Sequence, residues 1–232
     1  MVKPPKVLVY TLTSDRHSYV QELTMMAAIR MDYPNFNYLV IETSKDEKNY
    51  DYLKEKGWNI VRQDWIEGSM DRVVAGRNVA RQEAIDKEYD YVFGIDSDTI
   101  LPRYALKKMI NDEKDCIGYL NSMGKYLTFP CVFKSGTCFT DRPYTGLDLY
   151  DWQEIYALMP SVIKCHGATH GLIKTDVLRE IKWETLPNLV GEDILFYNNC
   201  EEKGFDWYCD LGVFAKHYSI PWDAKGVWGK IK

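Results

Sequence analysis

The sequence predicts a single α/β domain in which helices flank a mostly parallel central sheet. Apolar segments typical of buried strands alternate with segments of helical spacing between residues 6 and 112. The connections between them are short, and no linker or internal repeat divides the 232 residues. Such alternation is typical of a parallel sheet that is covered on both faces, and a chain of this length suits one domain.

Four strand–helix units make up the first half of the chain. Each expected strand is a run of apolar and aromatic residues, and each expected helix carries apolar residues three and four positions apart. The second helix stops at Gly57, and the fourth has Pro102 in its first turn, which are typical boundary signals. The expected strands are 6–12, 36–42, 58–63 and 89–95, and the expected helices are 19–31, 46–56, 70–86 and 102–112.

The second half of the chain has a different composition. Residues 120–161 are rich in Tyr, Phe, Gly, Pro, Thr and Asp and show no clear period. A loop of this length inside a compact domain is either a functional lid or a segment that contains short strands. Beyond it we expect a strand that runs into a helix at 165–181, a helix at 191–204 and a last short strand at 213–217.

The composition excludes several classes of function. The net charge is −5 and no basic block is present, which argues against nucleic acid as a partner. No stretch approaches the roughly 20 consecutive apolar residues of a membrane span. The apolar run after "MVKPPK" is short and lacks the cleavage site of a secretory signal. We therefore expect a cytoplasmic protein without a transmembrane segment, either free or peripheral at a membrane.

Two carboxylates follow the fourth expected strand. Asp96 and Asp98 enclose Ser97 directly after an apolar run, at the strand end where parallel sheets bind their ligands. In extended backbone, residues two apart point the same way, so both carboxylates can face one ligand. Their mutual repulsion is removed by a divalent cation, and Mn²⁺ or Mg²⁺ commonly binds to one or two carboxylates together with substrate phosphates. A turn with only a structural role is the alternative.

Four stretches, in this order, resemble the GT-A glycosyltransferases of the family-2 and yeast mannan types. They are "AGRNVARQEAI" (75–85), "GIDSDTILP" (94–102), "GEDILFYNNCEEKGFDW" (191–207) and "VFAKHY" (213–218). The second resembles the Asp-x-Asp motif of that family. The resemblance implies a GT-A (Rossmann-like) fold, a nucleotide-diphosphate-sugar donor and a divalent metal, Mn²⁺ or Mg²⁺.

The resemblance also implies roles for individual residues. Asp96 and Asp98 would hold the metal together with His217, and Ser97 would bind the nucleotide sugar beside them. Asp193 would take the proton from the acceptor hydroxyl, and Glu192 would bind acceptor hydroxyls. The alternative for the last two is a pair of acids that stabilises the start of a helix.

The base and ribose of the nucleotide are expected at the ends of the first strands. Thr11, Thr13 and Glu42 lie there, and Glu42 can accept a hydrogen bond from a base N–H or a ribose hydroxyl. Asp64, after the third strand, is a weaker candidate of the same kind. Arg77 resembles the arginine that contacts the base or the phosphates in the family, and its alternative is a surface salt bridge.

We therefore expect a metal-dependent glycosyltransferase, a hexosyltransferase, that moves a sugar from a nucleotide-diphosphate sugar to an acceptor hydroxyl with inversion. Residues 1–119 would bind the nucleotide sugar and residues 120–217 the acceptor. His166 and His170 are candidates for the acceptor pocket, and the alternative is that they are ordinary core or loop histidines. The aromatic and basic tail, 218–232, would cover the site as a lid or pack as an ordinary C-terminus. The acceptor is left open between a glycan, a lipid-linked sugar and a protein.

Two other functions share parts of this pattern. "DSDT" (96–99) also matches the nucleophile loop of haloacid-dehalogenase-type phosphatases, although that nucleophile follows the first strand and three strand–helix units precede Asp96 here. A non-catalytic carbohydrate-binding module would suit the 14% aromatic content. It gives no reason for the ordered set of acidic motifs and the terminal histidine.

Overall fold

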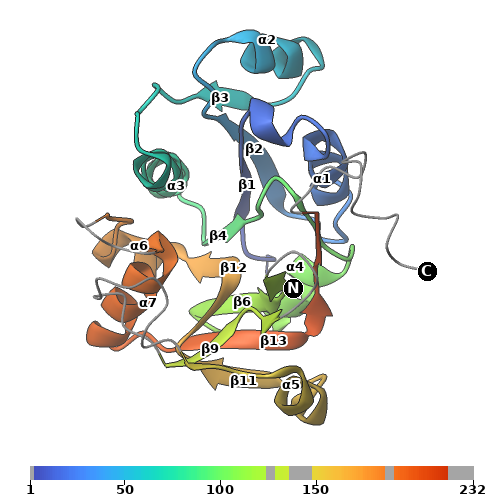
Figure 1. The fold of residues 1–232 in the computed structure, drawn as a ribbon, viewed down its shortest axis with the longest axis vertical. Coiled ribbons are helices and arrows are strands. Elements are labelled where there is room, and N and C mark those ends of the chain that lie inside the picture. The colour runs from blue at the N-terminus through green and yellow to red at the C-terminus, as the bar shows by residue number, and fades with distance from the viewer. Residues whose placement is uncertain (1–2, 124–128, 136–147, 186–190, 219–232) are drawn as a thin grey trace.

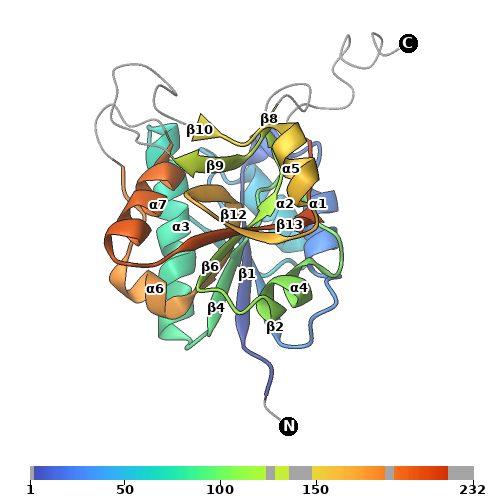
Figure 2. The same cartoon turned by 90° about the horizontal axis from the view of Figure 1, so that it is seen from below.

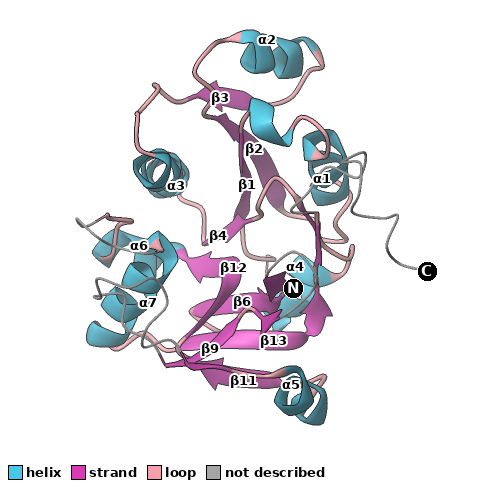
Figure 3. Cartoon of the chain, in the orientation of Figure 1, coloured by secondary structure: helices cyan, strands magenta, loops and turns pink. Residues whose placement is uncertain are grey.

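The computed structural model describes residues 3–123, 129–135, 148–185 and 191–218. Within them the chain forms a mixed sheet flanked by helices (Figures 1 and 3). The helices are α1 (Gln21–Ala28), α2 (Lys48–Glu55), α3 (Ser69–Asp86), α4 (Ala105–Asn111), α5 (Trp152–Leu158), α6 (Thr175–Glu180) and α7 (Glu192–Glu202).

The main path of the central sheet has the strand order β11-β13-β6-β12-β4-β1-β2-β3. Strands β1, β2, β3 and β4 pair in parallel, as do β6 and β13, whereas β12 runs antiparallel to both β4 and β6. These strands are β1 (Val7–Thr13), β2 (Phe36–Glu42), β3 (Ile60–Arg62), β4 (Tyr91–Gly94), β6 (Cys116–Leu120), β11 (Val162–Cys165), β12 (Gly167–Lys174) and β13 (Trp207–Phe214). The predicted fold class, a mostly parallel sheet flanked by helices, is confirmed.

Alternate residues of β1 enter two separate cores, one on each face of the sheet. Leu8 and Tyr10 pack on the face that α3, α6 and α7 cover, and Val7 and Val9 pack on the face with α1 and α4 (Figures 1 and 2). All four side chains are at most 3% exposed, which explains why the strand is apolar throughout. Among the described residues, no helix has the length and apolar character needed to cross a membrane.

The loop expected at 120–161 contains short elements in its described parts. These are β7 (Ser122–Met123), β8 (Phe129–Pro130), β9 (Val132–Ser135), β10 (Asp148–Leu149) and α5. Helix α5 begins with a capping box, in which the Asp151 carboxylate accepts from the Glu154 N–H and the Glu154 carboxylate accepts from the Asp151 N–H. Of the two interpretations of this segment, the structure supports the one with hidden strands for the residues that it describes.

The last expected strand, 213–217, is divided differently in the structure. Strand β13 already begins at Trp207, and Lys216 and His217 form a separate strand, β14. Strand β14 pairs with β5 (Thr99–Ile100), which directly follows the Asp-x-Asp segment. Lys216 and His217 therefore lie close to the segment that follows the carboxyl end of β4. Of the expected tail, 218–232, all but Tyr218 lies outside the described residues.

Candidate active site

The Asp-x-Asp segment leaves the sheet directly after β4. Asp96 and Asp98 are half-buried, and Ser97 between them is 3% exposed. The segment is a turn, in which the Thr99 N–H donates to the Asp96 carbonyl (3.0 Å), and not the extended backbone that the sequence led us to expect. Pairing of β14 with β5 places His217 opposite Thr99, with its Nε2 atom 3.2 Å from the Asp98 Oδ2 atom. The fold thus brings together two residues that the sequence predicts as metal ligands.

The two carboxylates differ in acidity. Burial raises the pKa of Asp98. The hydrogen bond and the charge of His217 lower it by more than burial raises it, so the pKa lies below its usual value. Burial also raises the pKa of Asp96. Arg77 opposes that effect and the neighbouring Asp98 adds to it, so the pKa of Asp96 lies above its usual value. A cation beside both carboxylates would favour the ionised form of each.

The donor set fits a divalent metal in type. Carboxylate oxygens suit Mn²⁺ and Mg²⁺, and an imidazole nitrogen is better suited to Mn²⁺. In the described part of the chain, no group of three or more His, Cys, Asp or Glu side chains is arranged to hold an ion by itself. The three predicted ligands, Asp96, Asp98 and His217, therefore do not form such a group in this structure.

A cavity of about 330 Å³ lies beside this segment, and we call it the central cavity. Its walls come from α3, the loop after β4, β9, β12, the start of α7 and β14. Five residues that the sequence predicts for the site line it together with His170: Arg77, Asp96, Glu192, Asp193 and His217. These six residues come from five separate segments of the chain and share one cavity.

Arg77 forms a buried ion pair with Glu192. Its Nη1 atom lies 2.7 Å from the Glu192 Oε1 atom, and both residues are less than one-tenth exposed. The alternative of a surface salt bridge is therefore wrong. The distance is that of an ion pair, but Nη1 is not aligned for a hydrogen bond and has no hydrogen-bond partner in the described structure. A buried donor of this kind is available to an anionic ligand.

Trp183 supports Arg77, although no pattern in the sequence predicts this contact. The guanidinium lies 4.4 Å from the centroid of the Trp183 ring, which stacks on Phe196 of α7. Asn78 fixes the backbone of Trp183 through two hydrogen bonds, from its Nδ2 atom at 2.8 Å and to its Oδ1 atom at 3.2 Å. The two neighbouring residues of α3 therefore act on the same tryptophan: Asn78 positions the Trp183 backbone, and Arg77 packs against the Trp183 ring.

Asp193 faces the central cavity from the first turn of α7. Burial and the negative charge of Glu192 raise its pKa to about 6, although Arg77 and a hydrogen bond from the Ile194 N–H (2.9 Å) oppose the shift. Gly191 precedes the helix with a φ of +91°, a conformation that favours glycine. A Cβ atom at that position would lie 2.7 Å from the Asp193 Oδ1 atom, so the glycine also makes room for this carboxylate.

His170 and Tyr10 form a buried pair at the base of the cavity. The Tyr10 hydroxyl lies 2.6 Å from the His170 Nε2 atom. Burial and the charge of Arg77 hold the pKa of His170 well below its usual value, so the ring is neutral. The histidine contacts the backbone of Gly94, where any Cβ atom would overlap its ring. Of the two histidines predicted for the acceptor pocket, His170 lines the central cavity and His166 does not.

Of the residues predicted to bind the base and ribose, the two threonines already have partners within the fold. The Thr11 hydroxyl accepts from Tyr38 (2.8 Å), and the Thr13 hydroxyl donates to Gln21 (2.6 Å). Glu42 is fully buried, and its Oε1 atom accepts from Ser44 and Asn49. Its Oε2 atom has no partner among the described residues.

Asp64 is exposed and lies just beyond β3. Within the predicted nucleotide-binding set, Glu42 is thus the residue with an unsatisfied acceptor. A buried carboxylate oxygen without a donor is costly. Glu42 is 0% exposed and does not line the central cavity, so a ligand N–H or hydroxyl reaches this oxygen only if the side chain moves.

Tyr218 links the end of the described chain to the Asp-x-Asp segment. Its N–H donates to the Asp98 carbonyl (2.7 Å), and its own carbonyl accepts from the Tyr19 hydroxyl (2.5 Å). These two hydrogen bonds hold the residue after β14 beside Asp98. The predicted lid beyond Tyr218 lies outside the described residues.

No protein-family model matches the chain, and a comparison with curated protein sequences finds no significant match. Solved structures do match. The A197 protein of STIV is 15% identical, with a TM-score of 0.52, and the alignment covers 93% of this chain and 87% of that one. The S. aureus glycosyltransferase TarS, residues 1–349 with UDP, is 20% identical with a TM-score of 0.53, and 90% of this chain matches 60% of it.

A further match is GalNAc-T7, another glycosyltransferase, whose structure was solved with UDP, GalNAc and Mn²⁺. It is 12% identical with a TM-score of 0.67, and 95% of this chain matches 44% of that one. The chain thus spans 60% of this TarS fragment and 44% of GalNAc-T7, less than two thirds in both cases. At these identities the likeness concerns the fold alone, and the chain has the fold that these glycosyltransferases share.

Proposed function

We propose that this protein is a metal-dependent glycosyltransferase that moves a hexose from a nucleotide-diphosphate sugar to an acceptor hydroxyl. The observation that carries the proposal is the central cavity, where Asp96 and His217 face Arg77, Glu192 and Asp193. Two proteins with the same fold were solved with UDP, one of them with Mn²⁺ as well. On this proposal residues 1–119 bind the donor and residues 120–217 bind the acceptor.

The donor would lie across the carboxyl ends of β1, β2 and β4. Glu42, which is fully buried and outside the central cavity, would accept a hydrogen bond from the base or the ribose once its Oε2 atom becomes accessible. Asp96, Asp98 and His217 would hold Mn²⁺, which stabilises the departing nucleoside diphosphate without a proton transfer. Arg77 adds a fixed positive charge on the cavity wall and a donor that is still unpaired among the described residues.

Asp193 would act as the general base. As the acceptor hydroxyl oxygen attacks the anomeric carbon, its proton passes to the Asp193 carboxylate and the bond to the diphosphate oxygen breaks. Attack from the face opposite the leaving diphosphate inverts the anomeric configuration. Glu192, held by Arg77 at 2.7 Å, would accept hydrogen bonds from acceptor hydroxyls and orient the attacking one.

The raised pKa of Asp193 predicts an acidic limb in the pH profile. A base must be ionised to accept a proton, so kcat/KM should be half-maximal near pH 6, level from about one pH unit above it and fall about tenfold per pH unit well below it. An aspartate with an ordinary pKa of 3.8 would stay active to pH 4–5. The measurement is kcat/KM between pH 4.5 and 8, together with the affinity for UDP over the same range.

The variant Asp193→Asn separates this limb from the titration of Asp96, whose pKa is also raised. If Asp193 causes the limb, the residual activity of the variant is level through pH 6. A wild-type profile that stays flat down to pH 5 would contradict the assignment.

The proposed function is tested by the Asp98→Ala variant. We expect Mn²⁺ together with one of UDP, GDP or TDP to stabilise the wild-type protein by about 2.7 kcal/mol when the nucleotide is at roughly 100 times its Kd. Removal of Asp98 takes away the carboxylate that contacts His217 and should abolish this Mn²⁺-dependent shift. The measurement is thermal unfolding with each nucleotide, with and without Mn²⁺.

A matched control is Glu180→Ala, which removes one negative charge from the exposed end of α6. It should respond to Mn²⁺ and nucleotide as the wild type does. An unchanged shift in Asp98→Ala would refute the metal site. Preferential hydrolysis of p-nitrophenyl phosphate over every nucleotide sugar would favour the phosphatase that the "DSDT" segment also resembles.

A further inference from the structure

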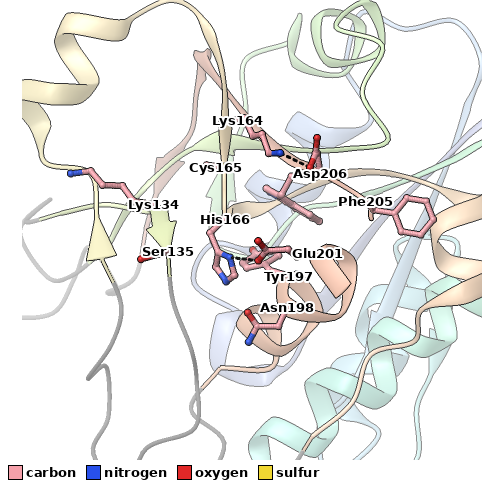
Figure 4. Close-up of a pocket in the computed structure, with 11 residues that line it drawn as sticks. Lys134, Ser135, Lys164, Cys165, His166, Tyr197, Asn198, Glu201, Phe205 and Asp206 are labelled. Carbon is pink, nitrogen blue, oxygen red and sulfur yellow. Dashed lines mark ion pairs between the residues drawn. The ribbon is translucent and has the colours of Figure 1, made fainter. Parts of the chain in front are cut away.

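We infer that a second cavity binds a neighbouring sugar unit of the acceptor, so that the acceptor is a glycan rather than a single sugar or a peptide. This inference rests on the proposed function. The cavity has a volume of about 410 Å³ and lies between β9, the residues before β12 and the outer half of α7. We call it the lateral cavity, and Figure 4 shows the residues that line it.

The lateral cavity is built from the same elements as the central cavity. On α7, Ile194 lines the central cavity, whereas Tyr197, Asn198 and Glu201 line the lateral one. Positions three, four and seven apart share one face of a helix, so the two cavities follow each other along that face. With a rise of about 1.5 Å per residue, the axial distance from Asp193 to Asn198 is roughly 7–8 Å.

Two strands repeat this order. On β9, Phe133 lines the central cavity, and Lys134 and Ser135 line the lateral one. His170 of β12 lines the central cavity, and His166, just before that strand, lines the lateral one. Three parts of the chain, α7, β9 and the segment 166–170, thus contribute residues to both cavities. A chain of linked units could occupy both cavities at once.

The charges of the lateral cavity favour a neutral ligand. Lys164 pairs with Asp206 at 2.6 Å, and Lys134 pairs with Glu154 at 2.7 Å. His166 contacts Glu201 at 3.2 Å, and the first and last of these pairs are drawn in Figure 4. Each lysine in the cavity therefore already has a carboxylate partner, and a phosphate or an acidic peptide would have to displace one.

Two polar groups in the wall are left for a ligand. The His166 side chain is 9% exposed, and its Nε2 atom is buried without a hydrogen-bond partner among the described residues. When the Nδ1–H donates to Glu201, Nε2 of the neutral ring is an acceptor and can receive a hydroxyl proton. The amide of Asn198 is half-buried and can both donate and accept.

Aromatic residues complete the wall. Phe205 and Trp207 line the cavity, and the Tyr197 ring lies 4.6 Å from that of Trp207. The Tyr197 hydroxyl is already used, because it donates to the Ala168 carbonyl. Tyr197 and Trp207 are at most 2% exposed and back the wall, whereas Phe205 is half-buried. A wall with apolar residues and a few convergent acceptors and donors is typical of a site for a small neutral ligand with apolar and hydroxyl-bearing faces. A sugar ring has this chemistry.

The test is direct binding of neutral saccharides without nucleotide or Mn²⁺. The probes are mono-, di- and trisaccharides of glucose, galactose and mannose, measured by isothermal titration calorimetry. We expect at least one trisaccharide to bind more tightly than its monosaccharide. Asn198→Ala and His166→Ala should each weaken trisaccharide binding roughly three- to tenfold, the size of one lost hydrogen bond. The monosaccharide affinity should not change.

The matched control is Glu202→Ala, on the exposed side of the same helix and outside the cavity, which should bind as the wild type does. Circular dichroism and melting temperature establish that each variant is folded. The absence of saccharide binding, or equal trisaccharide affinity in both variants and the wild type, would refute the inference, as would tight binding of peptides alone.

The proposed function and this inference can fail separately. Donor use is read from hydrolysis of nucleotide sugars with Mn²⁺, which does not need the lateral cavity. If saccharides bind as expected and no nucleotide sugar is hydrolysed, the cavity is a sugar site and the transferase proposal fails. If the donor is hydrolysed and no saccharide binds, the transferase proposal stands and the glycan acceptor fails.

Discussion

Replacing Asp193 with asparagine is expected to lower kcat by at least about 100-fold and to leave the affinity for the nucleotide sugar unchanged. Asparagine keeps the size of the side chain but cannot take a proton from the acceptor hydroxyl, and general base catalysis contributes roughly 10²–10⁴ in rate. Donor binding does not use that proton. The measurement is steady-state transfer, with donor affinity determined separately by titration and the anomeric configuration of the product by NMR.

The competing role for Asp193 is that of an acid in the first turn of α7. Loss of such a charge costs only about 0.3–1 kcal/mol of stability and would leave turnover nearly normal. The control is Asp176→Asn, which removes an acid from the first turn of α6, away from both cavities. Normal turnover in Asp193→Asn, or a product that retains the configuration of the donor, would remove the general-base role.

Replacing Arg77 with methionine is expected to lower the free energy of unfolding by about 3–5 kcal/mol. The substitution leaves Glu192 buried in the fold without its partner, and breaking a buried ion pair on one side carries this cost. It also removes the guanidinium from the Trp183 ring. The measurement is urea unfolding of the wild type, Arg77→Met, Glu192→Gln and the double variant, which together form a double-mutant cycle.

Arg103→Met is the matched control for this experiment. Arg103 pairs with Asp32 at 2.6 Å, but the two side chains are 71% and 52% exposed, so its loss should cost less than about 1 kcal/mol. In the double variant of the buried pair, Glu192→Gln removes the stranded charge, so much of the cost of Arg77→Met should be recovered. Equal destabilisation by Arg77→Met and Arg103→Met would contradict the burial of the Arg77–Glu192 pair.

Local patterns were sufficient to predict the parallel half of the fold. Strand β2 has the predicted bounds, since its seven residues are apolar or aromatic apart from Asn37 and Glu42. Strand β3 is shorter than expected because it pairs on one side only, with β2. The strands β6 and β11 were not predicted. They are short, and their partners β12 and β13 follow much later in the chain, so no local period marks them.

The candidate site was predictable where one segment carries the chemistry. Asp96 and Asp98 could be identified because two carboxylates directly follow an apolar strand. The Arg77–Glu192 pair could not, because it depends on how α3 packs against α7 across the central cavity. Tyr10 resembled an ordinary core residue in an apolar strand, and only the fold places its hydroxyl on His170.

The close packing of His170 on Gly94 has a consequence for how such a sequence can diverge. Gly94 lies one strand away from the histidine, and a methyl group there would overlap the imidazole ring. The two positions therefore cannot be substituted independently. A larger residue at position 94 requires a smaller one at position 170, and without the histidine a side chain larger than that of glycine fits at position 94. In related chains we expect substitutions at positions 94 and 170 to occur together. The residue at position 94 should therefore depend on the residue at position 170, although the two are far apart in the sequence.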